Sequence, residues 1–385
     1  MQGQQYHSIA KYLHWVIAAM IVLQFVLAKL AENADTPLEE LALVANHRSV
    51  GISIFLLAIC RLAWRLRQGV PRALPMPEWQ FIASRISHWS MYALIFLLPI
   101  TGWLASSASA HSVSWFNLVP LPALVAPDPR LEETLEEVHE IHATLLLIVA
   151  MIHIAAALWH SLKRDGALAR ITSPGPLILF VAVIAIGSVT LTRPVGGKEN
   201  TVRSSAPSTA AVARAVTTDL EAWSIDYGAS YIRFTAIQAG APIDGEWQEW
   251  TADLHFDAAR LDEALFDVSV TVASVETLDE DRDTLLQDAE WFDGETYPEV
   301  RYLAGRFERN AEGQYEALGA LTVKGRSVPV TLVFSDSGDA GRHILDGTAR
   351  LDRLMLDLGT GEWSDTRWIG RFVSVNVHVE ADAAD

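Results

Sequence analysis

VHEIHATLLLIVAMIHIAAALWH, residues Val138–His160, decides how the first half of the chain folds. The segment is apolar and long enough to cross a bilayer as a helix, yet it carries four histidines. In a helix, the fourteen residues from His139 to His153 return the side chain to within about 40° of the same face, about 21 Å further along. The next seven residues, to His160, drift by only about 20°. Because ionisable groups are costly inside a membrane, this face is a candidate cofactor site.

The charge of the chain divides into two parts. Residues 1–200 hold 14 Lys and Arg against 13 Asp and Glu, whereas residues 201–385 hold 15 against 34. An apolar half is thus followed by a strongly acidic, water-facing half, and the net charge of −18 argues against nucleic acid as a partner. Cys60 is the only cysteine, which excludes intrachain disulfides, cysteine-held iron–sulfur clusters and covalent c-type haem.

Five apolar runs in the first half predict five transmembrane helices. No cleavage-site pattern follows the first run, so we expect it to be retained rather than removed as a signal peptide. The last run contains no ionisable residue and is expected to be a tether without chemistry. The runs are Tyr12–Leu30, Ser49–Trp64, His88–Ser106, Thr144–Leu162 and Pro176–Thr192.

The loops predict how these helices are oriented. Arginines surround the connection between the second and third runs, whereas the first and third connections are acidic. Under the positive-inside bias, the arginine-rich loop is cytoplasmic and the acidic loops lie outside. We therefore expect a multi-pass protein of the bacterial inner membrane, with a cytoplasmic N-terminus and a periplasmic C-terminal half.

This topology places four histidines at two depths. His14 and His153 fall toward the cytoplasmic side, and His47 and His139 toward the outer side. Two pairs of facing imidazoles in a helical bundle suit two b-type haems, whereas zinc favours one compact tetrahedral cluster. His142 lies only about 20° from the face of His153 and stays an alternative to His139.

Four segments resemble the bacterial cytochrome b561 family: YLHW at 12–15, HRSVGISIFLLAICRLAWR at 47–65, SHWSMYALIFLLPITGW at 87–103, and the segment at 138–160. The resemblance covers about residues 5–172. It implies a di-haem b cytochrome that passes electrons between an outer donor and membrane quinone, with ubiquinone reduced and superoxide oxidised in some members. It also implies haem-iron ligation by His14, His47, His139 and His153, and a quinone contact at His160.

Three further residues are candidate cofactor contacts. Arg48 adjoins His47 and is a positive charge in an otherwise acidic outer region. The acidic loops disfavour superoxide as the donor, because a positively charged surface would be needed to speed the capture of this anion. Arg61 is expected either to pair with a haem propionate or to snorkel to the interface. His88 is expected to be an interfacial histidine bonded to a loop, with a quinone or propionate contact as the alternative.

The second half begins after a polar, small-residue linker. We predict a cytochrome domain at 1–172, a fifth helix at 173–193, a flexible linker at 194–218 and a soluble domain at 219–385. In the last, apolar and polar residues alternate, as at Val373, Val375, Val377 and Val379. About eight such antiparallel strands predict a closed barrel, which can hold a single apolar ligand.

Three stretches of this domain resemble the YceI family: WSIDYGASYIRFTA at 223–236, LLQDAEWFDGETYPEVRY at 285–302 and GALTVKGRSVPVTLVF at 319–334. The resemblance implies a lipocalin-like periplasmic barrel with a tunnel for an isoprenoid lipid or quinone. The charged run at 279–283 is expected to be solvated. Candidate lining residues, each of which is otherwise plain core, are Phe234, Phe256, Phe266, Trp291, Phe292 and Phe334.

Together these patterns predict a multidomain membrane protein, with an all-α four-helix di-haem bundle, a fifth tethering helix and a lipocalin-like antiparallel β-barrel. We expect a quinone-reducing oxidoreductase that takes electrons from a periplasmic donor, superoxide among them, while the barrel holds isoprenoid quinone or lipid. One alternative is a tethered isoprenoid-lipid carrier whose cytochrome half senses redox state. Another is the cytochrome b subunit of a larger dehydrogenase or hydrogenase.

Overall fold

The computed structural model describes residues 5–72, 74, 76–163, 166–192, 218–338 and 341–382. The chain divides into two compact units, Met1–Val195 and Gly196–Asp385. Each has a buried apolar core of its own. Of the linker predicted at 194–218, only Thr218 belongs to the described residues.

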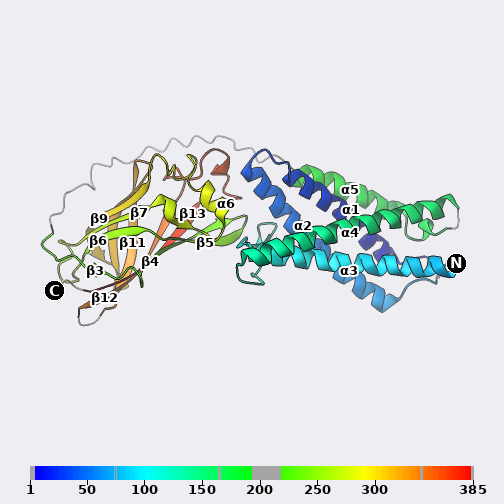
Figure 1. Ribbon diagram of the computed structural model, residues 1–385, viewed down its shortest axis with the longest axis horizontal. Coiled ribbons are helices and arrows are strands. Elements are labelled where there is room, and N and C mark those ends of the chain that lie inside the picture. The colour runs from blue at the N-terminus through cyan, green and yellow to red at the C-terminus, as the bar shows by residue number, and fades with distance from the viewer. Residues whose placement is uncertain are drawn as a thin grey trace. The chain divides into compact units, whose positions relative to one another are not determined.

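Five long helices form the first unit (Figure 1), and all five are long and apolar enough to cross a membrane. The predicted all-α class of this half is confirmed. α1 packs against α2 and α5, and α3 packs against α2 and α4. The helices are α1 Ser8–Ala31, α2 Pro37–Gln68, α3 Glu78–Ala108, α4 Pro129–Leu162 and α5 Pro174–Leu191.

α2 and α4 begin well before the apolar runs that predicted them. The Thr36 side chain accepts a hydrogen bond from the Glu39 backbone N–H, and Asp128 caps α4 in the same way. Proline follows each cap, and its fixed φ suits the first helical position. His47 and His139 therefore lie ten residues inside their helices rather than at the helix starts.

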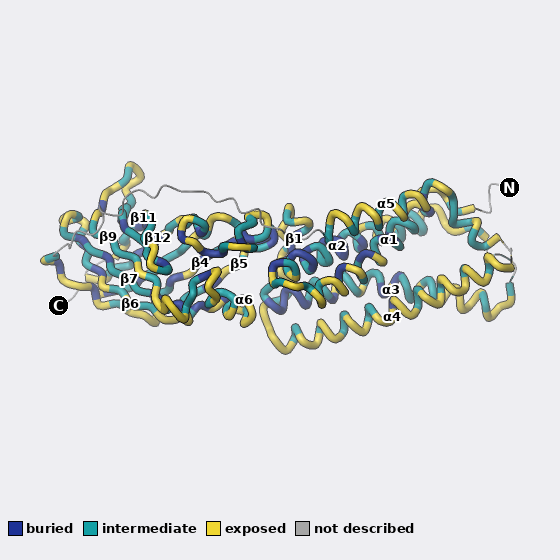
Figure 2. The backbone as a smooth tube through the Cα atoms, turned by 90° about the horizontal axis from the view of Figure 1, so that it is seen from above, coloured by how far each residue is buried: buried dark blue, intermediate teal, exposed yellow. Residues whose placement is uncertain are grey.

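The surface of α4 is largely apolar and exposed (Figure 2). Met151, Ile152 and Leu158 each keep more than half of their surface exposed. In water such a face would promote aggregation, whereas hydrocarbon covers it without cost. The exposure of α4 thus agrees with a multi-pass membrane protein.

α5 packs closely against α1, which a free tether would not do. A Cβ at Gly187 would lie 2.6 Å from Leu23 Cδ2, so a side chain there would force Leu23 to shift. At one end of α5, Asn46 Nδ2 of α2 donates a hydrogen bond of 2.9 Å to the Leu191 carbonyl. α5 is therefore an integral helix of the bundle.

One curled antiparallel sheet forms the second unit (Figure 1). Its hydrogen-bonded order is β6-β7-β9-β10-β11-β12-β13-β4-β5-β8, and β3 pairs with β13. The short helix α6, Glu280–Leu285, follows β8. The strands are β3 Ser224–Ile225, β4 Tyr231–Gln238, β5 Ala241–Trp247, β6 Trp250–His255, β7 Leu265–Thr271, β8 Val275–Glu276, β9 Glu299–Arg309, β10 Tyr315–Val323, β11 Arg326–Asp336, β12 Arg342–Asp352 and β13 Phe372–Asp382.

The antiparallel, lipocalin-like class of this unit is confirmed, but the sheet has 11 strands rather than about eight. Within the described residues, the end strands β6 and β8 are not paired with each other, so the sheet does not close into the expected barrel. The connection between β5 and β6 bonds elsewhere. Gln248 N–H donates to the Ser274 carbonyl, and Thr271 N–H donates to the Glu249 carbonyl.

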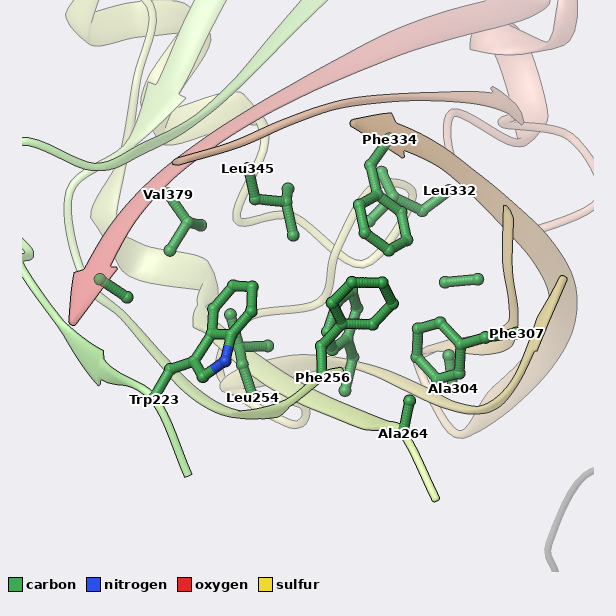
Figure 3. Packing of buried hydrophobic residues seen from close by; sticks show 13 residues of the cluster. Trp223, Leu254, Phe256, Ala264, Ala304, Phe307, Leu332, Phe334, Leu345 and Val379 are labelled. Atoms are coloured by element: carbon green, nitrogen blue, oxygen red, sulfur yellow. The ribbon is translucent and has the colours of Figure 1, made fainter. Parts of the chain in front are cut away.

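A cluster of aromatic and aliphatic side chains fills one part of the sheet interior (Figure 3). Phe256, Phe307 and Phe334 point toward one another in this cluster, and each is at most 7% exposed. Ala317 is opposite Phe307 in the ladder of β9 and β10, and its small side chain leaves room for the ring. The inward faces of the strands thus supply the core that alternation predicts.

We predict that Gly187→Leu lowers the unfolding temperature of the bundle, because the new side chain must displace Leu23 or part α5 from α1. Overpacking of this kind costs about 1–3 kcal/mol. Circular dichroism of the detergent-purified chain during heating measures it. Ala185→Leu, at an exposed position of the same helix, is the control and should leave the transition unchanged. Equal transitions in both variants would contradict the close packing of α5.

Candidate functional site

His47 of α2 and His139 of α4 face each other across the bundle, and we call them the outer pair after the side on which the sequence predicts them. Their ring centres are 6.3 Å apart, and the ring planes are inclined by 67°. The hydroxyl of Thr101 donates to the Leu98 carbonyl and lies 3.1 Å from His139 Nδ1. Because the hydroxyl has a single proton, Nδ1 is the donor to Thr101 and Nε2 keeps its lone pair. His139 is thus prepared to bind a metal through Nε2.

Two further observations define the outer pair. Gly102 of α3 lies against His139, since a Cβ there would approach its Cε1 to 3.0 Å. Nδ1 of His47 is buried and has no hydrogen-bond partner among the described residues. Nδ1 of His142 is buried in the same way, but the ring that faces His47 is that of His139.

His14 of α1 and His153 of α4 form a second pair, which we call the inner pair after its predicted side. Their ring centres are 6.5 Å apart, with planes inclined by 72°. His88 of α3 joins them, with its ring centre 5.2 Å from that of His153. Its Nδ1 donates 2.6 Å to the Ser84 carbonyl of its own helix, so it is not bonded to a loop as expected. The inner site therefore contains three imidazoles.

Both ring pairs fit a haem iron between them. An iron bonded at about 2 Å to one nitrogen of each ring would hold the ring centres about 6 Å apart. The two spacings match this value, and imidazole nitrogens suit iron in the absence of cysteine ligands. No compact cluster of His, Cys, Asp and Glu that would hold a bare metal ion occurs among the described residues.

Arg61 of α2 lies beside the inner site. Its Nε donates to Tyr92 Oη at 3.1 Å, and one terminal nitrogen donates to the Ala10 carbonyl at 3.1 Å. The guanidinium of Arg65, one turn later, stacks on the rings of Trp89 and Tyr92. These contacts fix two positive charges near one end of the bundle. Of the other predicted contacts, Arg48 follows His47 directly, and His160 lies two turns after His153 on α4.

The second unit encloses a narrow apolar cavity of about 200 Å³. Four of the predicted lining residues, Phe234, Phe266, Trp291 and Phe292, line it. The other two, Phe256 and Phe334, lie in the buried core cluster instead. Alternation alone places all of these rings inward, and it does not distinguish the wall of a cavity from the packing behind that wall.

Arg353 also lines the cavity, which the sequence analysis did not anticipate. It is 2% exposed, and its five N–H groups donate to the carbonyls of Leu358, Gly359, Trp363, Ile369 and Gly370. Burial lowers its pKa to about 10, so the side chain stays charged at neutral pH. It fastens the 358–370 segment over the end of β12.

Arg282 of α6 is the second buried arginine of the lining. Its Nε and one terminal nitrogen donate to the hydroxyl and carbonyl of Thr277, and Asp279 lies 3.4 Å away. Burial lowers its pKa, opposed by the carboxylates of Asp279 and Asp283. The expectation that the 279–283 run is solvated is therefore wrong at Arg282. A lone arginine amid acids carried no signal that would have marked it as buried.

We predict that Arg353→Lys destabilises the sheet unit by about 2–4 kcal/mol, because one ammonium group cannot satisfy five buried carbonyls. Urea unfolding of the full chain, followed by tryptophan fluorescence, measures this loss. Arg350→Lys, at an exposed position of β12 just before Arg353, should change the midpoint little. A small loss at Arg353, equal to that at Arg350, would show that the network contributes little.

Comparison with known proteins assigns both units. Residues 5–174 match the family model for prokaryotic cytochrome b561, and residues 223–381 match that for the YceI-like domain. A probable superoxide oxidase, CybB, from Yersinia pestis is 26% identical over 160 residues, 41% of this chain and 90% of that protein. Cytochrome b561 homolog 2 from Escherichia coli is 28% identical over 126 residues, 32% of this chain and 67% of that protein.

Among solved structures, BcnA from Burkholderia cenocepacia is 25% identical, with a TM-score of 0.40 over 41% of this chain and 99% of that one. The family match of the first unit implies haem b. α5 lies almost wholly between the two matched regions. The chain thus joins a region that matches prokaryotic cytochrome b561, at residues 5–174, to a region that matches the YceI-like domain, at residues 223–381.

Proposed function

We propose that residues 1–172 form a di-haem b cytochrome that passes electrons from a periplasmic donor to membrane quinone. The observation that carries this proposal is the pair of facing imidazole sets, with ring centres 6.3 and 6.5 Å apart, on helices of one bundle. Haem b supplies reversible one-electron transfer when bound. His47 and His139 would hold the outer haem, and His14 and His153 the inner one.

The residues around each pair have distinct tasks. Thr101 orients His139 through Nδ1, so the ring presents Nε2 to the outer haem. Arg61 would offset the negative charge of propionates at the inner haem, and Arg48 would do so at the outer haem. His160 is proposed to contact the quinone, where an imidazole can move a proton as the quinone is reduced. His88 would support His153 or the quinone.

Superoxide is the donor that we propose, although the acidic outer loops would not speed its capture. The match to a probable superoxide oxidase over most of that protein supports it. Each superoxide gives up one electron and leaves as dioxygen, and two electrons with two protons convert a quinone into a quinol. One quinone therefore consumes two superoxides, and protons are needed only at the quinone.

We further propose the predicted topology, with the N-terminus in the cytoplasm, the 219–385 domain in the periplasm and the helices in the bacterial inner membrane. The boundaries at 172, 193 and 218 belong to the same proposal. The apolar cavity of the sheet unit supports an isoprenoid ligand, either quinone or lipid, because it offers mostly hydrocarbon contacts. The two units would then share one class of substrate.

We predict that His47→Ala and His14→Ala each remove one haem, because an iron that loses one of its two imidazoles is held too weakly to persist through purification. His88→Ala is the matched control and should retain both. Haem content per chain, from the absorption spectrum of the dithionite-reduced protein, measures the outcome. Loss of one haem in His88→Ala, with no loss in His14→Ala, would reverse the assignment of the inner ligands.

Stopped-flow mixing of the purified protein with superoxide should reduce the haems, and ubiquinone should then reoxidise them. His160→Ala should slow the reoxidation by tenfold or more, with haem content unchanged, if it moves the proton. Haems that stay reduced with every quinone tested would contradict the enzyme and favour a redox sensor. Reduction only in the presence of an added dehydrogenase would favour a subunit of a larger complex.

A further inference from the structure

The cavity in the sheet unit is long and has two ends. Along the paired strands β12 and β13, Leu345 is opposite Val379 and Leu351 is opposite Val373, and all four side chains line the cavity. Six residues of strand separate the two pairs, a distance of about 20 Å. The cavity is therefore a tunnel along the strands, in which an extended chain can lie.

The two buried arginines of the lining lie beyond Leu351. Arg353 follows the end of β12 and donates to the Ile369 carbonyl, and Ile369 forms a bridge with Gln238. Gln238 in turn accepts a hydrogen bond of 3.3 Å from Arg282. The tail of an amphiphile that enters at this end would run toward Leu345.

The opposite end is filled by rings. Phe266 lines the tunnel and is 1% exposed. Its ring centre lies 4.9 Å from that of Phe307, 5.3 Å from Phe334 and 6.1 Å from Phe256. These three rings do not line the tunnel, and together with Phe266 they form what we call the ring cluster (Figure 3). Phe266 is thus the boundary between empty space and packed core.

The register of the strands holds the ring cluster in place. Phe266 is opposite Ala304 in the ladder of β7 and β9, and Phe307 is opposite Ala317 in that of β9 and β10. Both alanines are fully buried. Small side chains are opposite large ones here, so the rings fill the space between the strands and have no second position. A core packed in this way does not open to admit a ligand. A chain that enters the tunnel stops at Phe266.

We propose that the ring cluster is the closed end of the tunnel and sets the longest isoprenoid chain that the sheet unit accepts. This inference rests on the proposed lipid-binding function and adds the residue that determines its selectivity for chain length. Phe266 acts as the stop, and the other three rings support it.

The test uses the full chain in detergent and a series of isoprenoid alcohols of increasing length, with bound mass read by native mass spectrometry. Alcohols without a quinone ring avoid the quinone site proposed for the bundle. The wild type should bind up to a limiting length. Phe266→Ala should move that limit up by about one isoprene unit, the space that its ring vacates. Phe266→Leu, a milder change, should move it in the same direction.

Phe372→Ala is the matched control, since it removes a ring of the sheet unit that is 44% exposed and does not line the tunnel. Its limit should stay that of the wild type. Ala349→Phe adds a ring to the lining between Leu345 and Leu351 and should lower the limit. Equal limits in the wild type, both Phe266 variants and Ala349→Phe would overturn the inference while leaving lipid binding intact. A wild type that binds no alcohol of any length would overturn the proposed lipid function, and the inference with it.

Discussion

The spacing of His139 and His153 along one face of α4 is the constraint on which the first unit depends. Fourteen residues place two imidazoles about 21 Å apart on a helix that otherwise faces hydrocarbon. A polar ring in that setting is stable only when it is paired or ligated. α1 and α2 supply the partners, His14 and His47. The distances between the ring centres suit an iron atom bonded to both rings and are too long for a direct hydrogen bond between them. Haem therefore explains these distances better than helix packing alone.

The second unit separates polar and apolar groups in a different way. Its tunnel has hydrocarbon walls, and the arginines at one end are already bonded to the backbone or to neighbouring side chains. These arginines hold loops in place rather than waiting for a ligand. An apolar tail is therefore the part of a ligand for which the tunnel is best suited. If that ligand is a quinone, each unit handles the same molecule, one by redox chemistry and the other by storage or delivery.

The sequence was sufficient for the five helices and the antiparallel sheet, because each follows from a short-range period. It left His142 open as an alternative to His139, and the ring that faces His47 is that of His139. It was not sufficient where distant residues decide the outcome. The close approach of α5 depends on Leu23, which lies far from Gly187 in sequence. The burial of Arg353 depends on carbonyls of a later loop. Which rings line the tunnel and which form the ring cluster depends on the register of the strands. The open edge of the sheet depends on the hydrogen bonds of residues 248–249.

The most direct measurement is the number of haems per polypeptide in the purified wild type, expressed with ample haem supply. Protein concentration by amino-acid analysis and haem by its reduced pyridine spectrum give this ratio without any assumption about activity. Two b-type haems for each chain is the predicted result. A colourless protein, or one haem for each chain at full saturation, would contradict the two-layer arrangement of imidazoles and remove the electron path through the bundle.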